Sequence, residues 1–355
     1  MTLNAPVFTV DGDLARELAR DVVWLDVAED VCGLRRLEAA FDAADPFGGE
    51  DGDLLHLDGA TIGFGRELTV SLGPDDDQHI VFVGTISALA AERTEGTIPL
   101  TTVWAEDRLD ALRTTRRSRT YHDLSDADIA RLIAADHRLT PAVDAAGPTY
   151  DRVQQINQTD LAFLRERAER VGADVWLDGT RLVFAGRDRS AGPAVTLVYG
   201  NELIAVRARA DLAQQRTAIR VSGYDAAQRA VIEREAGPTT IDAEVTGGRT
   251  GPAVLERAVG PRPGHRVRDV PLSGDEAEAW ARAEMLGRCR RFVTVEGETS
   301  GTPALTVGAA LTLERVGGIF AGGGYRVTEV RHTYDPERGH RTGFRAERPT
   351  ITEAP

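Results

Sequence analysis

Lysine is absent from this 355-residue sequence, so arginine supplies all 42 of its basic side chains. The absence excludes a phosphate-binding loop built around a lysine, a Schiff-base lysine and a serine–lysine catalytic pair. Cysteine is scarce as well: Cys32 and Cys289 are the only two, and they form no CxxC motif. We therefore expect neither a disulfide framework nor a structural zinc site.

Long apolar runs and targeting signals are also missing. No stretch approaches the roughly 18 consecutive apolar residues that a membrane-spanning helix needs. The first residues, MTLNAPVFTVDGD, lack the basic and apolar regions of a secretory signal. We therefore expect a protein that is assembled in the cytoplasm, with no membrane insertion.

Motifs for catalysis, cofactors and metals are lacking too. The histidines form no HxH or HExxH pair, GxSxG does not occur, and no glycine-rich stretch follows a strand and opens a helix. An acidic stretch near residue 50 does not follow the ligand spacing of an EF-hand and is interpreted as a surface loop. We expect no catalytic, cofactor-binding or metal-binding residue, no cofactor and no enzymatic turnover. The residues considered are His56, His79, His122, His137, His265, His332 and His340, and the acidic Glu50, Asp51, Asp53 and Asp58.

The charge is strongly acidic, with 56 carboxylates and a net charge of −14. This balance argues against specific nucleic-acid binding. One basic cluster, Arg113, Arg116, Arg117 and Arg119, is interpreted as a connector, with contact to a partner or nucleic acid as the alternative. A glycosidase needs only two carboxylates across a cleft, so a carbohydrate- or peptidoglycan-active hydrolase on a β-scaffold stays open as an alternative function.

Residues 1–112 alternate between apolar and polar with period two, as in Leu68, Val70 and Leu72. Turn signals such as Gly73-Pro74 and Glu95-Gly96 separate the alternating stretches. This pattern is typical of an antiparallel barrel or sandwich.

Residues 113–192 change to a mixture of helix and strand. Ser125 and Asp128 form a capping box before a helix whose apolar face is predicted to be Ile129, Leu132 and Ile133.

The most legible unit of the sequence is residues 150–187. A strand leads into a helix capped by Asn157 or Thr159, with Asp160 at its positive end. Gly172 ends the helix, and Asp178-Gly179 is a strong hairpin signal between two apolar runs. We predict a strand, a capped helix and a tight hairpin in this order.

Strands return over 194–199, 203–207, 217–221 and 230–234. Residues 238–273 are rich in Gly, Pro and Thr and are interpreted mainly as loop. The helix at 274–289 begins acidic and ends basic, as the helix dipole favours. The last part alternates again from Leu305 to Val330, with a turn at Gly322–Gly324 and a hairpin tip at 336–339, and His332 is expected to be half-exposed.

These patterns predict a mainly β (α+β) fold with an inserted α/β domain. We assign 1–112 plus 193–237 to a first, discontinuous β domain, 113–192 to the insertion and 238–355 to a second β domain. The strands after Ala194 are too few to close a barrel alone. Residues 195–235 are therefore expected to pair with 60–104.

Four stretches resemble a known family, the late control D proteins that form the tail hub of contractile phages. The hub part of type VI secretion spikes and of extracellular contractile injection systems is similar. The order of the stretches along roughly 300 residues is more specific than any one of them. They are VDGDLARELARDVVWLDVAEDVCGLRRLEAAF, DRLDALRTTRRSRTYHDLSDADIARLIAADHRLT, QINQTDLAFLRERAERVGADVWLDGTRLVF and YRVTEVRHTYDPERGHRTGFRAER.

This resemblance implies a structural protein, a homotrimeric baseplate hub with two antiparallel β-barrel domains in each chain. Three chains would present six similar barrels and so join a three-fold spike to a six-fold tail tube. Likeness between GTISALAAERTEGTIPLTTVWAED and the closing hairpin suggests an internal duplication. The family's larger spike proteins continue beyond the hub, so the spike, the tail tube and other baseplate proteins are expected to be separate partners.

Two further expectations concern the assembled particle. A hub that encloses a channel must let cargo or DNA slide through, so we expect a neutral to acidic channel wall. A surface adhesin is the other competing class, and the missing secretion signal argues against it.

Overall fold

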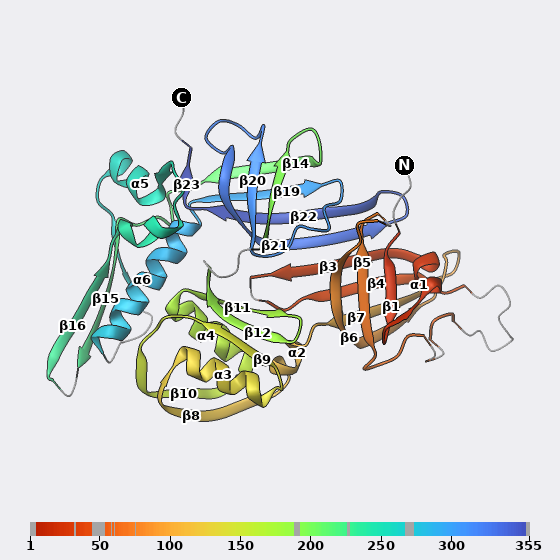
Figure 1. The fold of residues 1–355 in the computed structure, drawn as a ribbon, viewed down its shortest axis with the longest axis horizontal. Coiled ribbons are helices and arrows are strands. Elements are labelled where there is room, and N and C mark those ends of the chain that lie inside the picture. The colour runs from red at the N-terminus through yellow and green to blue at the C-terminus, as the bar shows by residue number, and fades with distance from the viewer. Residues whose placement is uncertain are drawn as a thin grey trace.

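The structure, a computed structural model, describes residues 5–31, 33–44, 54–57, 59, 61–74, 76–187, 192–225, 228–266 and 273–352. About half of these residues form β strands, and one sheet of 13 strands runs through the molecule. Two strand-rich halves lie side by side, with an α/β insertion below them and a helical arm at one end (Figure 1). The predicted mainly β fold with an inserted α/β part is confirmed.

The first β unit is built from the N-terminal strands, which pair antiparallel in the order β3-β4-β7-β6-β5-β1. A short strand, β2, pairs with the outer edge of β1. The elements are β1 (Val7–Val10), β2 (Asp13–Leu14), α1 (Arg16–Asp21), β3 (Val22–Asp30), β4 (Arg36–Asp42), β5 (Glu67–Leu72), β6 (His79–Glu92) and β7 (Leu100–Glu106).

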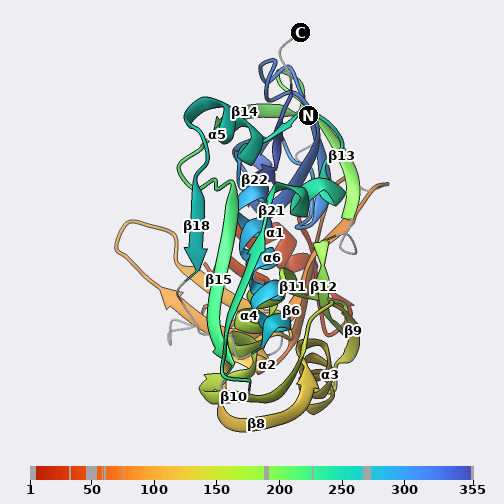
Figure 2. The same cartoon turned by 90° about the vertical axis from the view of Figure 1, so that its left-hand side faces the viewer.

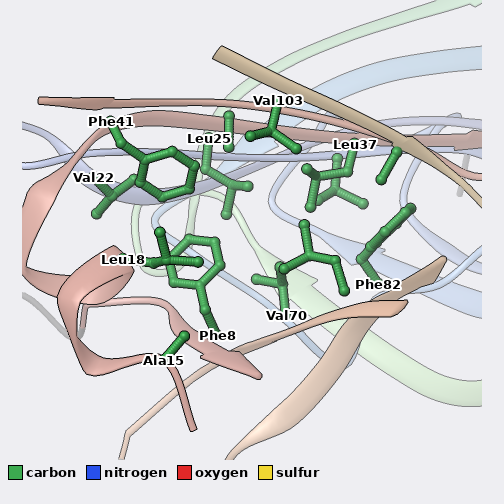
Figure 3. Close-up of a cluster of buried hydrophobic side chains, with 14 of the residues drawn as sticks. Phe8, Ala15, Leu18, Val22, Leu25, Leu37, Phe41, Val70, Phe82 and Val103 are labelled. Carbon is green, nitrogen blue, oxygen red and sulfur yellow. The ribbon is translucent and has the colours of Figure 1, made fainter. Parts of the chain in front are cut away.

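The core of this unit lies inside the folded-over sheet. Alternation along each strand sends one set of side chains inward, where Phe8 and Val70 from one layer face Phe41 and Val103 from the other (Figure 3). The rings of Phe8 and Phe41 meet edge to face with centroids 5.4 Å apart. Burial of such side chains, at roughly 1.5–3 kcal/mol each, stabilises the curved sheet.

The second β unit contains the C-terminal strands together with two strands that follow the insertion. They pair in the order β14-β19-β22-β21-β20-β13, antiparallel except for β13 with β20. Tyr325, Val327 and Phe344 are among its buried core residues. The strands are β13 (Gly192–Val198), β14 (Leu203–Ala210), β19 (Val293–Thr299), β20 (Ala309–Glu314), β21 (Gly322–Asp335) and β22 (Gly339–Arg348).

The two β units have the same strand order. When β2 is set aside and the six main strands of each unit are numbered along the chain, both sheets read 2-3-6-5-4-1. The directions agree for all pairs except the last, because β1 is antiparallel to β5 whereas β13 is parallel to β20. The topology therefore supports the internal duplication that the sequence suggested.

The correspondence extends to a bulge in the fifth strand of each unit. The pairing with the sixth strand shifts between Ile86 and Ala88 in β6, and between Val327 and Glu329 in β21. At each bulge a hydroxyl donates to a carbonyl of the sixth strand at 3.4 Å, Ser87 to Trp104 and Thr328 to Arg345. Bulges re-aim a strand and are specific features of a fold, so this match aligns β6 with β21 residue by residue.

One direct strand pairing joins the units into a single sheet. Strand β3 of the first unit pairs antiparallel with β21 of the second, from Asp30 opposite Glu329 to Leu25 opposite Tyr334. Tyr334 accordingly packs in the core of the first unit.

The insertion has a core of its own between two small sheets and its helices. Strand β8 pairs with β10, and β11-β12-β9 form a three-stranded sheet in which β12 and β9 are parallel. The elements are α2 (Asp110–Arg113), β8 (Arg116–Ser125), α3 (Asp126–Asp136), β9 (Thr140–Asp144), β10 (Thr149–Thr159), α4 (Asp160–Val171), β11 (Ala173–Asp178) and β12 (Arg181–Gly186).

Most local predictions for the insertion are confirmed. Ser125 and Asp128 form the capping box, Thr159 caps α4 by accepting from the Ala162 amide, and Gly172 ends it with φ of 71°. The predicted hairpin is β11–β12. One residue was assigned wrongly, since Leu132 is 47% exposed rather than part of the buried face.

The helical arm lies between β14 and β19 in the chain. Helix α6 packs across β15 and β16, burying Trp280 and Met285 (Figures 1 and 2). The short strand β17 pairs with β23. The elements are β15 (Ala218–Asp225), β16 (Ala230–Ala236), η2 (Pro238–Glu244), β17 (Arg249–Thr250), α5 (Gly251–Val259), β18 (Pro263–Arg266), α6 (Gly274–Arg290) and β23 (Thr350–Ile351).

The expected pairing of residues 195–235 with 60–104 is wrong. Strands β13 and β14 pair with β20 and β19, and β15 pairs with β16 and β18. The described strands β13 and β14, which follow the insertion, therefore belong to the second β unit and do not pair with the first. The physical reason is that β19 to β22 lack two outer strands, which β13 and β14 supply.

Three local assignments were also wrong. A stretch interpreted as loop contains η2 and α5, the latter capped by Thr250 with Pro252 in its first turn. The predicted turn at Gly322–Gly324 is the start of β21. Leu305 and Val307 lie outside any strand; Leu305 is buried in the core of the second unit, and Val307 is partly buried against it.

Neither unit closes into a barrel in the part of the chain that the structure describes. The outer strands of each unit, β1 with β3 and β13 with β14, do not pair with one another. In the second unit a hydrogen bond from the Gly200 amide to the Leu203 carbonyl, at 3.1 Å, bridges the start of the gap.

Candidate functional site

The junction of β3 with β21 is the first candidate surface, because it fixes the two β units relative to each other. On its outer face the Arg331 guanidinium donates to the Asp26 carboxylate across the two strands. Close by, Arg35 donates to Glu29 at 2.7 Å, and burial raises the pKa of Glu29. Backbone pairing and the Arg331–Asp26 ion pair thus both hold the junction.

A buried polar cluster lies beneath this junction. His332 Nδ1 is 3.2 Å from His340 Nε2, and Thr342 Oγ1 is 3.1 Å from both of these nitrogens. Burial lowers the pKa of His332 to about 3 and that of His340 to about 4. Both imidazoles are therefore neutral near pH 7.

His332 is only 5% exposed, so the expectation of a half-exposed side chain is wrong. Its strand, β21, pairs with β22 on one side and with β3 on the other. Strand β3 therefore covers the side of His332 that would be exposed if β21 had a free edge. A void of about 20 Å³, room for about one water, separates His332 from Glu29 and Arg35.

Two strand edges form the second candidate surface. Strand β14 pairs with β19 on one side, and no described strand pairs with its other side. In β6, Thr85 is the last residue paired with β5, so Ala88–Glu92 pair only with β7. Unpaired edges present free backbone N–H and C=O groups, which another chain can complete.

Buried arginines anchor the insertion to the second unit and the arm. Arg187 pairs with Glu347 of β22 and with Asp174 of β11. Arg290 at the end of α6 donates to Glu244 at 2.9 Å and to the Gly172 carbonyl at 3.5 Å. These contacts hold the insertion against β22 and against helix α6.

A cleft of about 700 Å³ runs between the insertion and α6. Its charged lining carries both signs, with Arg187, Arg282 and Arg290 close to Glu244, Asp275 and Glu278. Glu244 is already paired with Arg290, with N–O distances down to 2.5 Å. Mixed charge with internal pairing is typical of a packed boundary between parts of a protein.

Among the described residues, the carboxyls Asp107 and Asp126, whose pKa is raised, are already hydrogen-bonded to partners. A glycosidase acid needs a raised pKa and access to the glycosidic oxygen. Burial raises the pKa of Asp107 to about 6, but its two oxygens accept from the backbone amides of Arg35 and Leu109 at 3.0 and 2.9 Å. Asp126, whose pKa burial also raises, is held by Arg167 and Tyr150.

Three of the four arginines in the basic cluster at 113–119 pair with carboxylates. Arg113 pairs with Asp110 at 2.5 Å, Arg119 with Asp136 at 2.5 Å, and Arg117 with Asp160 at 3.4 Å. Arg116 donates to the Asn157 carbonyl at 2.7 Å. This pattern favours the connector interpretation.

Of the histidines considered from the sequence, His332 and His340 lie next to each other. The described residues contain no group of three or more His, Cys, Asp or Glu placed to hold a metal. His56 and His137 each contact one aspartate, Asp21 at 2.9 Å and Asp160 at 2.8 Å. Glu50, Asp51, Asp53 and Asp58 lie outside the described residues.

Among the described helices, none is both long and apolar enough to cross a membrane.

The family model described as the Alg8 N-terminal domain matches residues 51–335. No curated protein matches the sequence. The late control D family, named above from the sequence, is not the one whose model matches.

Several solved structures share the fold at low identity. The 43 kDa tail protein of prophage MuSo2 from Shewanella oneidensis is 14% identical with a TM-score of 0.67, over 98% of both chains. A tail protein from Neisseria meningitidis is 15% identical with a TM-score of 0.66, over 97% of this chain and 96% of that one. An Escherichia coli component of the type VI secretion system is 13% identical with a TM-score of 0.57, over 93% of this chain and 73% of that one. The fold is therefore that of phage tail proteins.

Proposed function

This chain belongs to the family described as the Alg8 N-terminal domain, and we propose that it is the structural hub at the baseplate of a contractile phage tail or injection particle. Three copies would join a six-fold tail tube to a three-fold spike. The tail-protein fold and the resemblance to the late control D family support this role.

The observation that carries the proposal is the duplicated strand order. Each chain holds two β units with the order 2-3-6-5-4-1, fused through β3 and β21. Three chains therefore hold six such units, which match a six-fold partner on one side. The unique parts of the chain, the insertion and the arm, occur once per chain and so keep three-fold symmetry for the spike.

The partners follow from this symmetry argument. The tail tube is the six-fold partner, and a separate spike protein is the three-fold partner. A neutral to acidic channel wall remains our expectation for the assembled trimer. The outer face around the β3–β21 junction carries both positive and negative side chains, since Arg345 pairs with Glu296 at 3.2 Å and with Glu329 at 3.0 Å. Such a face is not strongly basic, which supports this expectation.

The test is the mass of the complex. We expect light scattering of the protein purified alone at high concentration to give three copies of the 38.3 kDa chain. After co-expression with its tube and spike partners, we expect the mass that remains once the partners' masses are subtracted to equal three copies. A chain that stays monomeric under both conditions would contradict the proposal. A trimer that binds neither partner would contradict the hub role but not the trimer.

A further inference from the structure

The equivalent of the β3–β21 junction does not form within the described chain, because the two strands that correspond to β3 and β21 each lack a partner on one edge. In the numbering shared by the two units, strand 2 of the first unit (β3) pairs with strand 5 of the second (β21). Strand 2 of the second unit is β14, and strand 5 of the first is β6. At the equivalent edge β3 and β21 pair with each other, whereas no described strand pairs with β14 or with the end of β6.

The position of the open edge in β6 matches that of the junction in β21. Alignment of the two bulges places Ala88 at the position of Glu329 and Glu92 at that of Thr333. In β21 the residues paired with β3 are Glu329–Tyr334. The unpaired edge Ala88–Glu92 of β6 is thus equivalent to the segment of β21 that pairs with β3, but it has no described partner strand on that side.

The position of β14 matches that of β3 in the same way. Asp26 of β3 lies opposite Glu38 of β4, and Arg207 of β14 lies opposite Glu296 of β19. Glu38 and Glu296 are themselves equivalent, because they pair with Trp104 and Arg345 beside the two bulges. Arg207 therefore occupies the place of Asp26, with the opposite charge.

We propose that β14 of one copy of this chain pairs antiparallel with Ala88–Glu92 of β6 in a second copy, in the register of the β3–β21 junction. Asp26 lies opposite Thr333 in that junction, so Arg207 lies opposite Glu92 in the new one. Ala208 then lies opposite Ala91, and Arg209 opposite Ala90. The partner of this surface is a second copy of the chain. This inference rests on the proposed hub function, because three such contacts would join three copies in a ring.

Charge selects the correct partner for each strand. The internal junction sets Asp26 against Arg331, whereas the proposed junction sets Arg207 against Glu92. If β14 took the place of β3, its arginines would face Arg331, and like charges across strands repel. The inversion favours a ring in which first and second units alternate.

Small side chains leave the edge of β6 accessible. Ala90, Ala91 and Glu92 are exposed, whereas His332, at the position of Ala91, is buried because β3 covers it. Strand addition would bury Ala91 in the same way. The new pairing completes backbone hydrogen bonds on both edges at once.

Paired cysteines test the register. Arg207→Cys with Glu92→Cys and, separately, Ala208→Cys with Ala91→Cys are made in a Cys32→Ser background, where Cys289 is buried. Adjacent positions of an antiparallel pair alternate between wide and narrow Cα spacing, so one of the two suits a disulfide. Arg209→Cys with Glu92→Cys, two residues out of register, is the matched control. We expect oxidation to link copies for one in-register pair and not for the control.

Charge swaps give a second readout. Arg207→Glu and Glu92→Arg are each expected to weaken self-association about 2- to 5-fold per contact, and the double swap to restore it. An assembly of the expected mass that forms no in-register link and ignores the swaps would overturn this contact while leaving the hub proposal intact. A chain that never associates, alone or with its partners, would overturn both.

Discussion

Buried polar side chains lie where the parts of this protein meet. Arg187 joins the insertion to β22, Arg290 joins it to the arm, and His332 lies beneath the junction of the two β units. Removal of one partner from such a pair leaves a desolvated group without compensation. These residues therefore make the arrangement of the parts sensitive to single substitutions.

The first prediction concerns acid. The pKa values of His332 and His340 are lowered to about 3 and about 4 in the folded protein, against about 6.5 unfolded, so the folded state binds fewer protons. Their contribution to stability is complete above pH 6.5 and is lost as pH falls. We expect each histidine to reduce the free energy of unfolding by roughly 3 kcal/mol between pH 7 and pH 4, and the pair by roughly 6 kcal/mol.

Urea unfolding at several pH values checks this, with the double variant His332→Gln/His340→Gln as the control. Asp107 acts in the opposite sense, because its raised pKa of about 6 makes ionisation costly above that pH. The difference between wild type and the variant isolates the histidines. Parallel pH curves for the two proteins would contradict the prediction.

The second prediction concerns the buried pair of Arg167 and Asp126 in the insertion. Arg167 also lies 4.4 Å from the centre of the Tyr150 ring. Arg167→Met should lower the free energy of unfolding by about 3–5 kcal/mol, since Asp126 stays buried with its charge unpaired. Adding Asp126→Asn should recover part of this loss. A double variant less stable than the single one in urea unfolding would show that the unpaired charge is not the cause.

At the scale of elements, helix α4 rests on a local signal that can be tested alone. Thr159→Ala removes the oxygen that accepts from the Ala162 amide, and we expect a loss of about 1 kcal/mol in thermal or urea unfolding. Thr159→Ser keeps that oxygen and serves as the matched control. Equal effects of the two substitutions would mean that the cap contributes nothing measurable.

The open edges make a separate prediction about hydrogen exchange. Amides on the free edges of β14 and of β6 at Ala88–Glu92 should exchange fast in the monomer and slow at least 10-fold on assembly, as backbone pairing protects them. Amides of β19, which is paired on both sides, should stay protected in both states. Slowing at β19 without slowing at the two edges would place the contact elsewhere.

Local elements were predictable from the sequence, and long-range pairing was not. The capped helix α4 and the hairpin β11–β12 depend on residues close in sequence, such as Thr159 and Gly172. The partners of β13 and β14 lie about a hundred residues later, and a period-two pattern names no partner. The open edges could not be predicted for the same reason, because a strand has an open edge only when no other strand pairs with that side.

Residue-level signals failed where a neighbouring strand changed the environment. His332 alternates with polar residues and so looked half-exposed, yet β3 and β22 enclose it. Helix α5 was missed because Gly251 and Pro252 read as loop residues, although Pro is favoured in a helix's first turn. The charge inversion between Asp26 and Arg207 could be seen only after the two units had been aligned by structure.

At the scale of the whole molecule, one chain contains the same strand arrangement twice and the insertion and arm once. In the proposed hub, three copies of such a chain would meet six-fold and three-fold partners at the same time. The fusion through β3 and β21 sets the two units at a fixed distance, and β14 with β6 would repeat that spacing between copies. In the proposed assembly, the spacing set by β3 and β21 would therefore recur around a ring of three copies.

Electron cryo-microscopy of the complex formed with the tube and spike partners tests this account most directly. We predict three copies around one axis, with six β units at nearly equal spacing, and β14 of each copy continuing the sheet of the next through β6. A complex in which the two β units of a chain lie at different radii, or in which only one of them faces the tube, would contradict the central claim.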